Sequence, residues 1–419
     1  MDDGDIGPKR DDLTKGIDKK KIQFVAYLFM FFLGASWASI GVVVNSISVN
    51  LGVGVPSIVA SFTSFTIACT IMVFVTTGVL LEFYSIKKVS LSAIFLLLGG
   101  IGIILIATNM LTLNIALFTY GIGYGMSFSL GYYYIIYITD NKSRAAKMAI
   151  VSLIYSVGAM AAPKISSLML SVGISWHLAF SCYIVVMIVS LIMIIYTRFA
   201  LPGEENPRSK SSHPKLKAAR TWVDELSSWP ITVYIMGFAL FIYVIAETII
   251  VLWLVVYGNK ELGMTLEMAS YLASIFWGSV IIGRFIAGYA LKVISPELYI
   301  CIICIVSGIL LVLFSSISTN PTTAFILIAL CGIGFAAAYS TIASSGTTQV
   351  PHATGRLTSV MLGAGALGTV AAPLITSYVV SISGLEYVFV YCAFFMFFVV
   401  VLVLIVMAVN RMRGYKQHK

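Results

Sequence analysis

The sequence predicts an all-α polytopic membrane protein whose twelve transmembrane helices form two parallel six-helix repeats. The first observation is composition: 59% of the residues are hydrophobic and 10% are charged, where a soluble domain carries about 25% charge. The second is a series of twelve apolar segments, each close to the roughly 20 residues that a helix needs to cross a bilayer. These segments are 23–46, 57–81, 88–107, 113–138, 147–171, 176–197, 231–257, 269–291, 297–317, 322–344, 357–381 and 386–410.

The division into halves follows from an internal repeat. "GAMAAPKISS" at 158–167 matches "GTVAAPLITS" at 368–377 at an offset of 210 residues, and "GIGYG" at 121–125 matches "GIGFA" at 332–336. A long polar connection separates the two copies, and its end, "RTWVDELSSWP", predicts a short helix in the membrane interface. We therefore expect a polar arm (1–21), a first half (22–197), a central loop (198–230), a second half (231–410) and a basic tail (411–419).

Basic residues predict the orientation. Of the 26 Lys and Arg residues, 24 fall in the two terminal segments, in the central loop or at connections on the same side. The positive-inside rule then places both termini in the cytoplasm. The net charge of +9 reflects this topology, so we expect no nucleic-acid partner.

Two ionisable residues lie well inside apolar segments, Lys164 in 147–171 and Glu247 in 231–257. Counted from the cytoplasmic ends of these segments, both lie about 25 Å deep, which predicts opposite charges at matched depth, one in each half. A charge at the membrane centre costs about 2.5–3.5 kcal/mol on insertion scales, so such groups are candidates for handling substrate or protons. The alternative is that Lys164 extends to the interface and that Glu247 hydrogen-bonds to a neighbouring helix.

Aromatic and hydroxyl side chains predict the lining of a central pathway. Tyr120, Tyr124, Ser127 and Tyr134 follow steps of 4, 3 and 7 residues and therefore share one face of a helix. The predicted lining is completed by Trp37, Asn45, Tyr339, Ser340 and Ser344. Such a lining suits a small polar organic solute, whereas the alternative is that the tyrosines only pack or lie at the interface.

The segment after the second span, "GVLLEFYSIKK", resembles the G-x-L-x-D-R-x-G-R/K-K motif of the major facilitator superfamily. The matching positions are Gly78, Leu80, Glu82, Lys87 and Lys88. The second copy, "GRFIAGYALKVISP", together with "LGMTLEMASYLASIFWGSVIIGR" and "YSTIASSGTTQ", is similar to the fucose–proton symporter and TsgA-like branch. The resemblance covers about residues 21–412 and implies a secondary transporter that works by alternating access.

The motif residues are interpreted as a gate. Glu82 beside Lys87 and Lys88 suggests a cytoplasmic latch between helices, although Phe83 and Ser85 depart from the motif. Arg284 ends the eighth span on the same side and is assigned to the mirrored latch. The acidic groups that the fucose symporter has in spans one and four are absent, so sugar specificity is not implied.

The predicted function is secondary active transport of a small polar or anionic organic solute, with proton-coupled import favoured. Export by proton antiport and a non-transporting sensor are the alternatives. The expected partners are the solute, protons and membrane lipids, and we expect a monomer. No enzyme, metal or cofactor is expected: the histidines (177, 213, 352, 418) are scattered, "CIIC" at 301–304 lies in an apolar segment, and "GAGALG" at 363–368 has no preceding strand.

Overall fold

The computed structural model describes residues 18–139, 141–199, 227–317, 320–350 and 355–417. These residues form helices, and no strand occurs among them. In the N-terminal half the helices are α1 (Lys19–Leu51), α2 (Val55–Val75), the π-helix η1 (Thr76–Leu80), α3 (Leu81–Phe83), α4 (Ile86–Leu105), α5 (Met110–Ile138), α6 (Asn141–Ser171), α7 (Trp176–Ser181) and α8 (Ile184–Tyr196). In the C-terminal half they are α10 (Ile231–Lys260), α11 (Leu266–Ala290), α12 (Pro296–Ile317), α13 (Pro321–Phe335), α14 (Ala338–Thr347), α15 (Gly355–Ser383), η2 (Leu385–Tyr387) and α16 (Val388–Gln417).

Eleven helical segments are long and apolar enough to cross a membrane, and they coincide with eleven of the predicted spans. The remaining span, 113–138, forms the 29-residue helix α5. Tyrosine and glycine lower the hydropathy of α5, and much of this helix is buried against its neighbours. The prediction of an all-α polytopic membrane fold is confirmed.

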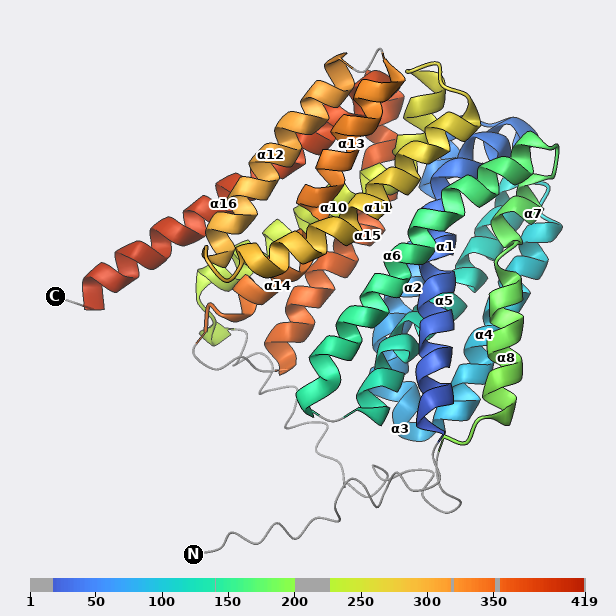
Figure 1. Cartoon of the computed structure of the whole chain (residues 1–419), viewed down its shortest axis with the longest axis horizontal. Helices are drawn as coiled ribbons and strands as arrows, with labels where there is room; N and C mark the ends of the chain where they lie inside the picture. The colour runs from blue at the N-terminus through green and yellow to red at the C-terminus, as the bar shows by residue number, and fades with distance from the viewer. Residues whose placement is uncertain (1–17, 140, 200–226, 318–319, 351–354, 418–419) are drawn as a thin grey trace, which may run out of the picture.

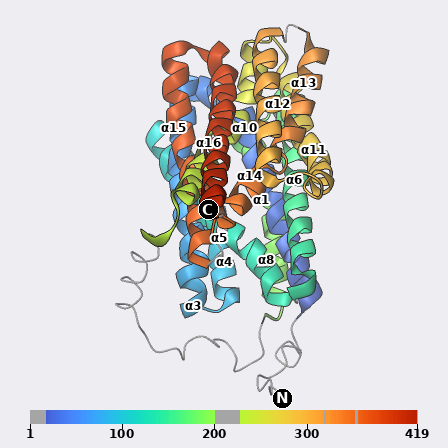
Figure 2. The same ribbon diagram turned by 90° about the vertical axis from the view of Figure 1, so that its left-hand side faces the viewer.

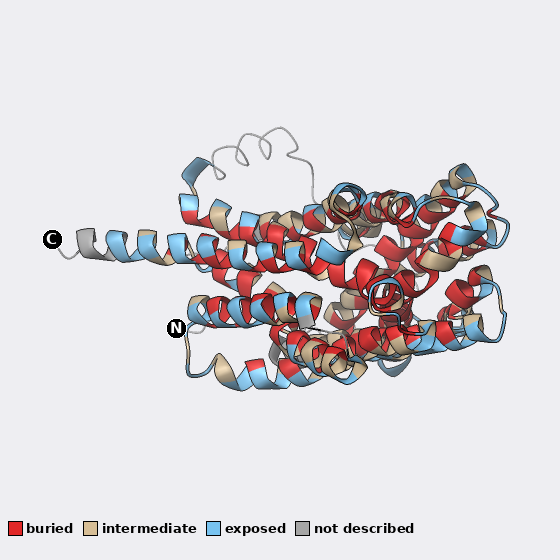
Figure 3. Ribbon diagram, turned by 90° about the horizontal axis from the view of Figure 1, so that it is seen from above, coloured by how far each residue is buried: buried red, intermediate tan, exposed pale blue. Residues whose placement is uncertain are grey.

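The two halves lie side by side and diverge toward one end of the molecule (Figure 1). In Figure 1 the start of α1 lies at the bottom and the end of α16 at the left, both on the side toward which the halves diverge, which we call the terminal end. Seen from above, buried residues lie along the inner faces of the helices and exposed residues along the outer faces (Figure 3). The central helices are α1 and α10, with 78% and 89% of their most apolar windows buried, against 33–56% for the other spans. Most of the predicted polar arm and central loop, including the predicted interfacial helix around Trp222, lies outside the described residues.

The repeated glycine motifs have the same packing role in both halves. A Cβ atom on Gly121 of α5 would overlap the carbonyl oxygen of Phe65 in α2. In the second half, a Cβ atom on Gly332 of α13 would lie 2.5 Å from the carbonyl oxygen of Phe276 in α11. "GIGYG" and "GIGFA" therefore let the fourth span of each half approach the second span closely.

The halves meet along three pairs of helices: α1 with α10, α2 with α15, and α6 with α11. Figure 2 shows α6 and α11 together on one side of the molecule and α15 on the other. The repeat exchanges the last two pairs, because α6 corresponds to α15 and α2 to α11. We call the line of contact between α6 and α11 the α6–α11 seam.

Contacts along the α6–α11 seam end near Arg284. At the end opposite the termini, the ammonium of Lys164 lies over the ring of Tyr271, and Arg284 bonds to α6 further along. Beyond Arg284, the position of a Cβ on Gly288 has no atom within 4 Å, and Tyr289 is 72% exposed. The two helices therefore separate toward the terminal end.

Three spans are interrupted, which the sequence did not predict. The second span changes to π-helix at Thr76–Leu80, and the sixth is divided into α7 and α8. The tenth is divided into α13 and α14 around Ala336 and Ala337. An interruption leaves backbone carbonyls without helical partners, and these need other donors inside a membrane.

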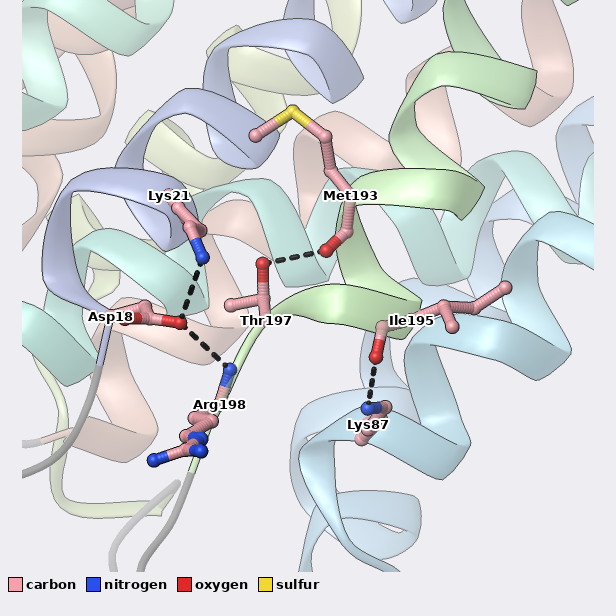
Figure 4. Close-up of polar contacts among 7 residues, drawn as sticks. All are labelled: Asp18, Lys21, Lys87, Met193, Ile195, Thr197 and Arg198. Carbon is pink, nitrogen blue, oxygen red and sulfur yellow. Dashed lines mark hydrogen bonds and ion pairs between the residues drawn. The ribbon is translucent and has the colours of Figure 1, made fainter.

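Polar contacts tie together the helix ends of the first half at the terminal end (Figure 4). The N–H of Asp18 donates to the carbonyl of Arg198 at 3.2 Å, and the N–H of Arg198 donates to the Asp18 carboxylate at 3.3 Å. The Arg198 N–H, followed by the Lys21 ammonium, holds the pKa of Asp18 below its ordinary value. Lys87 donates to the carbonyl of Ile195 at 2.6 Å, so a cation stabilises the carboxyl end of α8.

The close approach of α1 to α10 gives a test of the packing. A Cβ on Gly41 would lie 2.5 Å from the carbonyl oxygen of Val251, whereas one on Gly102 of α4 would have no atom within 4 Å. We expect Gly41→Ala to lower the melting temperature in detergent, since overpacking costs on the order of 1–3 kcal/mol, and Gly102→Ala to leave it unchanged. Equal melting temperatures for both variants would contradict this account of the interface.

Candidate functional site

Glu247 and Arg284 come together where the two halves meet. Glu247 is on α10 and Arg284 on α11, and Arg284 is the charged group that interacts electrostatically with Glu247. The Nη1 group of Arg284 donates to the carbonyl of Ser152 at 2.7 Å and to the hydroxyl of Ser156 at 2.9 Å. Both serines belong to α6, so this cation of the second half is bonded to the first half.

Aromatic side chains surround this pair of charges. Tyr155 of α6, Tyr243 of α10 and Tyr339 of α14 interact electrostatically with Glu247. Tyr132 of α5 interacts with both Arg284 and Tyr339. We call this group the Glu247–Arg284 site, which comprises Glu247, Arg284, Tyr132, Tyr155, Tyr243, Tyr339, Ser152 and Ser156.

The interruption of the tenth span helps to build the site. The hydroxyl of Tyr243 donates to the carbonyl of Phe335 at 2.9 Å. The Nε group of Arg284 donates to the carbonyl of Ala336 at 3.5 Å. These carbonyls lie at the end of α13, where the helix leaves its last acceptors without internal donors. Arg284 therefore joins three elements, since it lies on α11 and bonds to both α6 and the end of α13.

Glu247 and Arg284 do not touch directly. Among the described residues, the ion pair within 4.0 Å is that of Lys21 with Asp18. Glu247 lies deep in the protein and still keeps some accessible surface, so space remains beside its carboxylate. The hydrogen bonds of Arg284 in the described structure use Nε and Nη1, which leaves both N–H groups of Nη2 available.

Lys164 lies outside the Glu247–Arg284 site. Its Nζ atom lies 4.9 Å from the ring centroid of Tyr271 on α11, and its side chain is exposed. Glu247 faces Tyr155, which precedes Lys164 by nine residues, about 13 Å along a helix. The prediction of matched depth is therefore wrong, and the expected pairing of Lys164 with Glu247 is not formed in this structure.

The tyrosines that share one face of α5 lie inside the first half. Tyr120 hydrogen-bonds to Ser36 at 2.5 Å, and Tyr124 donates to the carbonyl of Leu33 at 3.0 Å. Tyr134 hydrogen-bonds to Ser90 of α4, and the Ser127 hydroxyl is buried without a partner in the described part of the chain. This face packs against α1 and α4, and Tyr132, on a different face of the helix, is the α5 residue that reaches Arg284.

The remaining predicted lining residues are spread over α1 and α14. Trp37 stacks on Phe65 with ring centroids 6.0 Å apart. In the internal repeat, Trp37 of the first half corresponds to Glu247 of the second half. Asn45 is partly exposed further along α1, and Ser340 and Ser344 are exposed on α14. Their assignment to a substrate pathway stays a prediction.

Of the predicted gating residues, Arg284 has the clearest placement. It lies between the halves, whereas the side chain of Glu82 lies outside what the structure describes. Lys87 is bonded within its own half, and Lys88 is exposed. In the described ranges no three His, Cys, Asp or Glu side chains converge on a metal position.

A profile of the Major Facilitator Superfamily matches residues 26–372, and the chain therefore belongs to this superfamily. It is a secondary transporter, an integral membrane protein that acts on a small-molecule substrate and is not an enzyme. The expected likeness to the TsgA branch is also confirmed. The chain is 20% identical over 366 residues to the "Protein TsgA homolog" of Yersinia pestis (strain Pestoides F) and to that of Yersinia pseudotuberculosis serotype O:1b (strain IP 31758). Each match covers 87% of this chain and 90% of the relative.

Solved structures of other transporters share the fold. A peptide transporter POT in complex with sulfate has a TM-score of 0.76 and 14% identity over 98% of this chain and 99% of its own. The nucleoside transporter NupG has a TM-score of 0.72 and 15% identity over 92% of this chain and 99% of its own. At this identity the likeness concerns the fold and not the solute.

The electrostatic coupling in the site is testable without a substrate. Arg284→Gln removes three hydrogen bonds and leaves Glu247 without its cation, so we expect a lower melting temperature. Adding Glu247→Gln should restore part of the loss, with a coupling on the order of 0.5–3 kcal/mol. Lys292→Gln, at an exposed position just beyond α11, is the control and should have no effect. Strictly additive losses in the double variant would show that the two charges do not interact.

Proposed function

We propose that this transporter moves a small polar or anionic organic solute by alternating access and imports it together with protons. The observation that carries the proposal is the Glu247–Arg284 site, in which an acid and a base face each other where the halves meet. Ionisable groups inside a membrane are rare, and they commonly mark solute or proton pathways.

Rocking of the halves would change the surroundings of both charges. Arg284 bonds to Ser152 and Ser156 of the opposite half, and separation at this seam breaks those bonds. Water would then reach Glu247 from a different side. The proton affinity of a carboxylate depends on hydration and on the distance to a cation, so the two conformations can bind the proton differently, which coupling requires.

Contact between the two halves on the side opposite the terminal end is consistent with alternating access. The halves touch at Gly41 and Val251 and at Lys164 and Tyr271, while the α6–α11 seam ends before the terminal end. Lys164 would then contribute to the outer closure, and Glu82 with Lys88 to the inner gate. These are proposals for roles in gating and are separate from solute binding.

Glu247→Gln tests proton coupling. With the solute found by a thermal-shift screen of sugars, amino acids and carboxylates, vesicles under a pH gradient should no longer accumulate it through this variant. Counterflow exchange should continue, because the neutral amide mimics the protonated acid. Glu261→Gln, an exposed acid at the end of the same helix, is the matched control and should accumulate normally. Accumulation by Glu247→Gln at the wild-type level would refute the assigned role.

The same assay separates the alternatives. An exporter would drive the solute out of vesicles when protons flow the opposite way, whereas a sensor would bind the solute without moving it. Import is favoured because a proton on Glu247 and an anion at Arg284 can strengthen each other's binding. The two would then move together, in the direction in which protons flow into the cell. Reversal of flux relative to the proton gradient would establish export.

The assignment of the terminal end to the cytoplasm predicts which segments a protease outside the cell can reach. Lys and Arg cluster in the terminal segments and the central loop, so protease added to intact cells should not cleave the segment 203–216 or remove a tag at either terminus. In permeabilised cells the protease should cleave the segment 203–216 and remove a tag at either terminus. A tag at position 260, on the opposite side, is the control and should be cleaved in intact cells. Cleavage of the central loop in intact cells would reverse the topology.

A further inference from the structure

Arg284 commits two of its three guanidinium nitrogens to hydrogen bonds and leaves the third, Nη2, free in the described structure. Its Nε and Nη1 groups bond to Ala336, Ser152 and Ser156, which fix the plane of the side chain. Both N–H groups of Nη2 remain without a partner in the described structure. A donor group of this kind, on a guanidinium held by its other hydrogen bonds, is suited to an oxygen of a carboxylate or phosphate group.

Glu247 is the acid that interacts electrostatically with Arg284. The titratable and charged groups that interact with it are Arg284 of α11, Tyr155 of α6, Tyr339 of α14 and Tyr243 of α10 itself. The helices α1, α15 and α16 also pack against α10 and add none among the described residues. Lys164, the other intramembrane cation, lies beside Tyr271, so Arg284 is the cation that faces Glu247.

We propose that the free Nη2 group of Arg284 binds the anionic group of the solute, so that the substrate class is small organic anions, and that protonation of Glu247 admits the anion. This inference rests on the proposed transport function and names its substrate class. Ionised Glu247 neutralises Arg284 and repels an incoming anion. Protonated Glu247 leaves one uncompensated positive charge, which an anion balances.

The sign of the pH dependence follows from this competition. One proton promotes binding of one anion, so the affinity falls by at most about tenfold for each pH unit above the titration of Glu247. A cationic solute would bind Glu247 in place of the proton, and its affinity would rise with pH. A neutral solute would show neither trend. Tyr132, Tyr155 and Tyr339 would offer hydroxyl groups and ring faces to the remainder of the molecule.

The experiment measures binding to the purified full chain in detergent at pH 5.5 and pH 7.5. The probes are lactate, succinate, benzoate and glycerol 3-phosphate, with glycerol and benzyl alcohol as neutral analogues and benzylamine as the cationic analogue. We expect at least one anion to stabilise the protein and to bind several-fold more weakly at the higher pH. Its neutral analogue should not bind.

Three variants test the assignment of residues. Arg284→Gln should lose the anion, and Arg284→Lys should bind it weakly, because an ammonium keeps the charge but lacks the planar guanidinium that Ala336, Ser152 and Ser156 hold in place. Glu247→Gln should bind with equal affinity at both pH values, near that of the wild type at pH 5.5. Lys292→Gln should behave as the wild type. Since Arg284→Gln could fail to fold, the pH dependence and the Glu247→Gln result test the proposal independently.

Several outcomes would overturn the inference. They are a lack of binding by all four anions, an anion affinity that rises with pH, or unchanged anion binding in Arg284→Gln. Uptake of a neutral solute that depends on Glu247 would reject the anion site and leave proton-coupled transport in place. Anion binding with the expected pH dependence but without uptake in vesicles would reject the proposed transport function and support the anion site.

Discussion

The bond from Arg284 to α6 connects the two halves of the transporter through a charged group. Its donors reach Ser152 and Ser156 on one side and the end of α13 on the other. A buried cation is tolerated only with such partners, since an uncompensated charge away from water is strongly destabilising. The position of α6 against α11 and the interruption of the tenth span therefore depend on the same side chain.

This dependence explains why a broken helix is stable inside an apolar bundle. The carbonyls of Phe335 and Ala336 would be costly without donors, and Tyr243 and Arg284 supply them. Tyr243 itself is fully buried on α10, which packs directly against α11, the helix of Arg284. Movement of Arg284 would release one of these carbonyls, so the conformation of the tenth span is linked to the charge state of the site.

The fold was predictable because the length of the apolar segments, the distribution of positive charge and the internal repeat can all be recognised in the sequence without knowing how the helices pack. The site was only partly predictable. Glu247 stands out as an acid in an apolar run, but Arg284 was assigned to the end of the eighth span, whereas α11 continues beyond it to Ala290. The approach of Tyr132 and Tyr155 depends on how separate helices pack, and no spacing in either helix records it. The placement of Lys164 beside Tyr271 depends likewise on how α6 packs against α11, which apolar windows do not record.

The two seams between the halves are related by the repeat but differ in chemistry. On the α6–α11 seam, Arg284 bonds to Ser152 and Ser156. On the opposite seam the equivalent of Arg284 is Phe74, whose ring lies 3.8 Å from where a Cβ on Gly363 would stand. An apolar contact of this kind is indifferent to protons and anions, and it can slide without breaking hydrogen bonds. In the proposed mechanism the solute and the proton act on the α6–α11 seam, while the apolar seam supplies contact that persists when the first one opens.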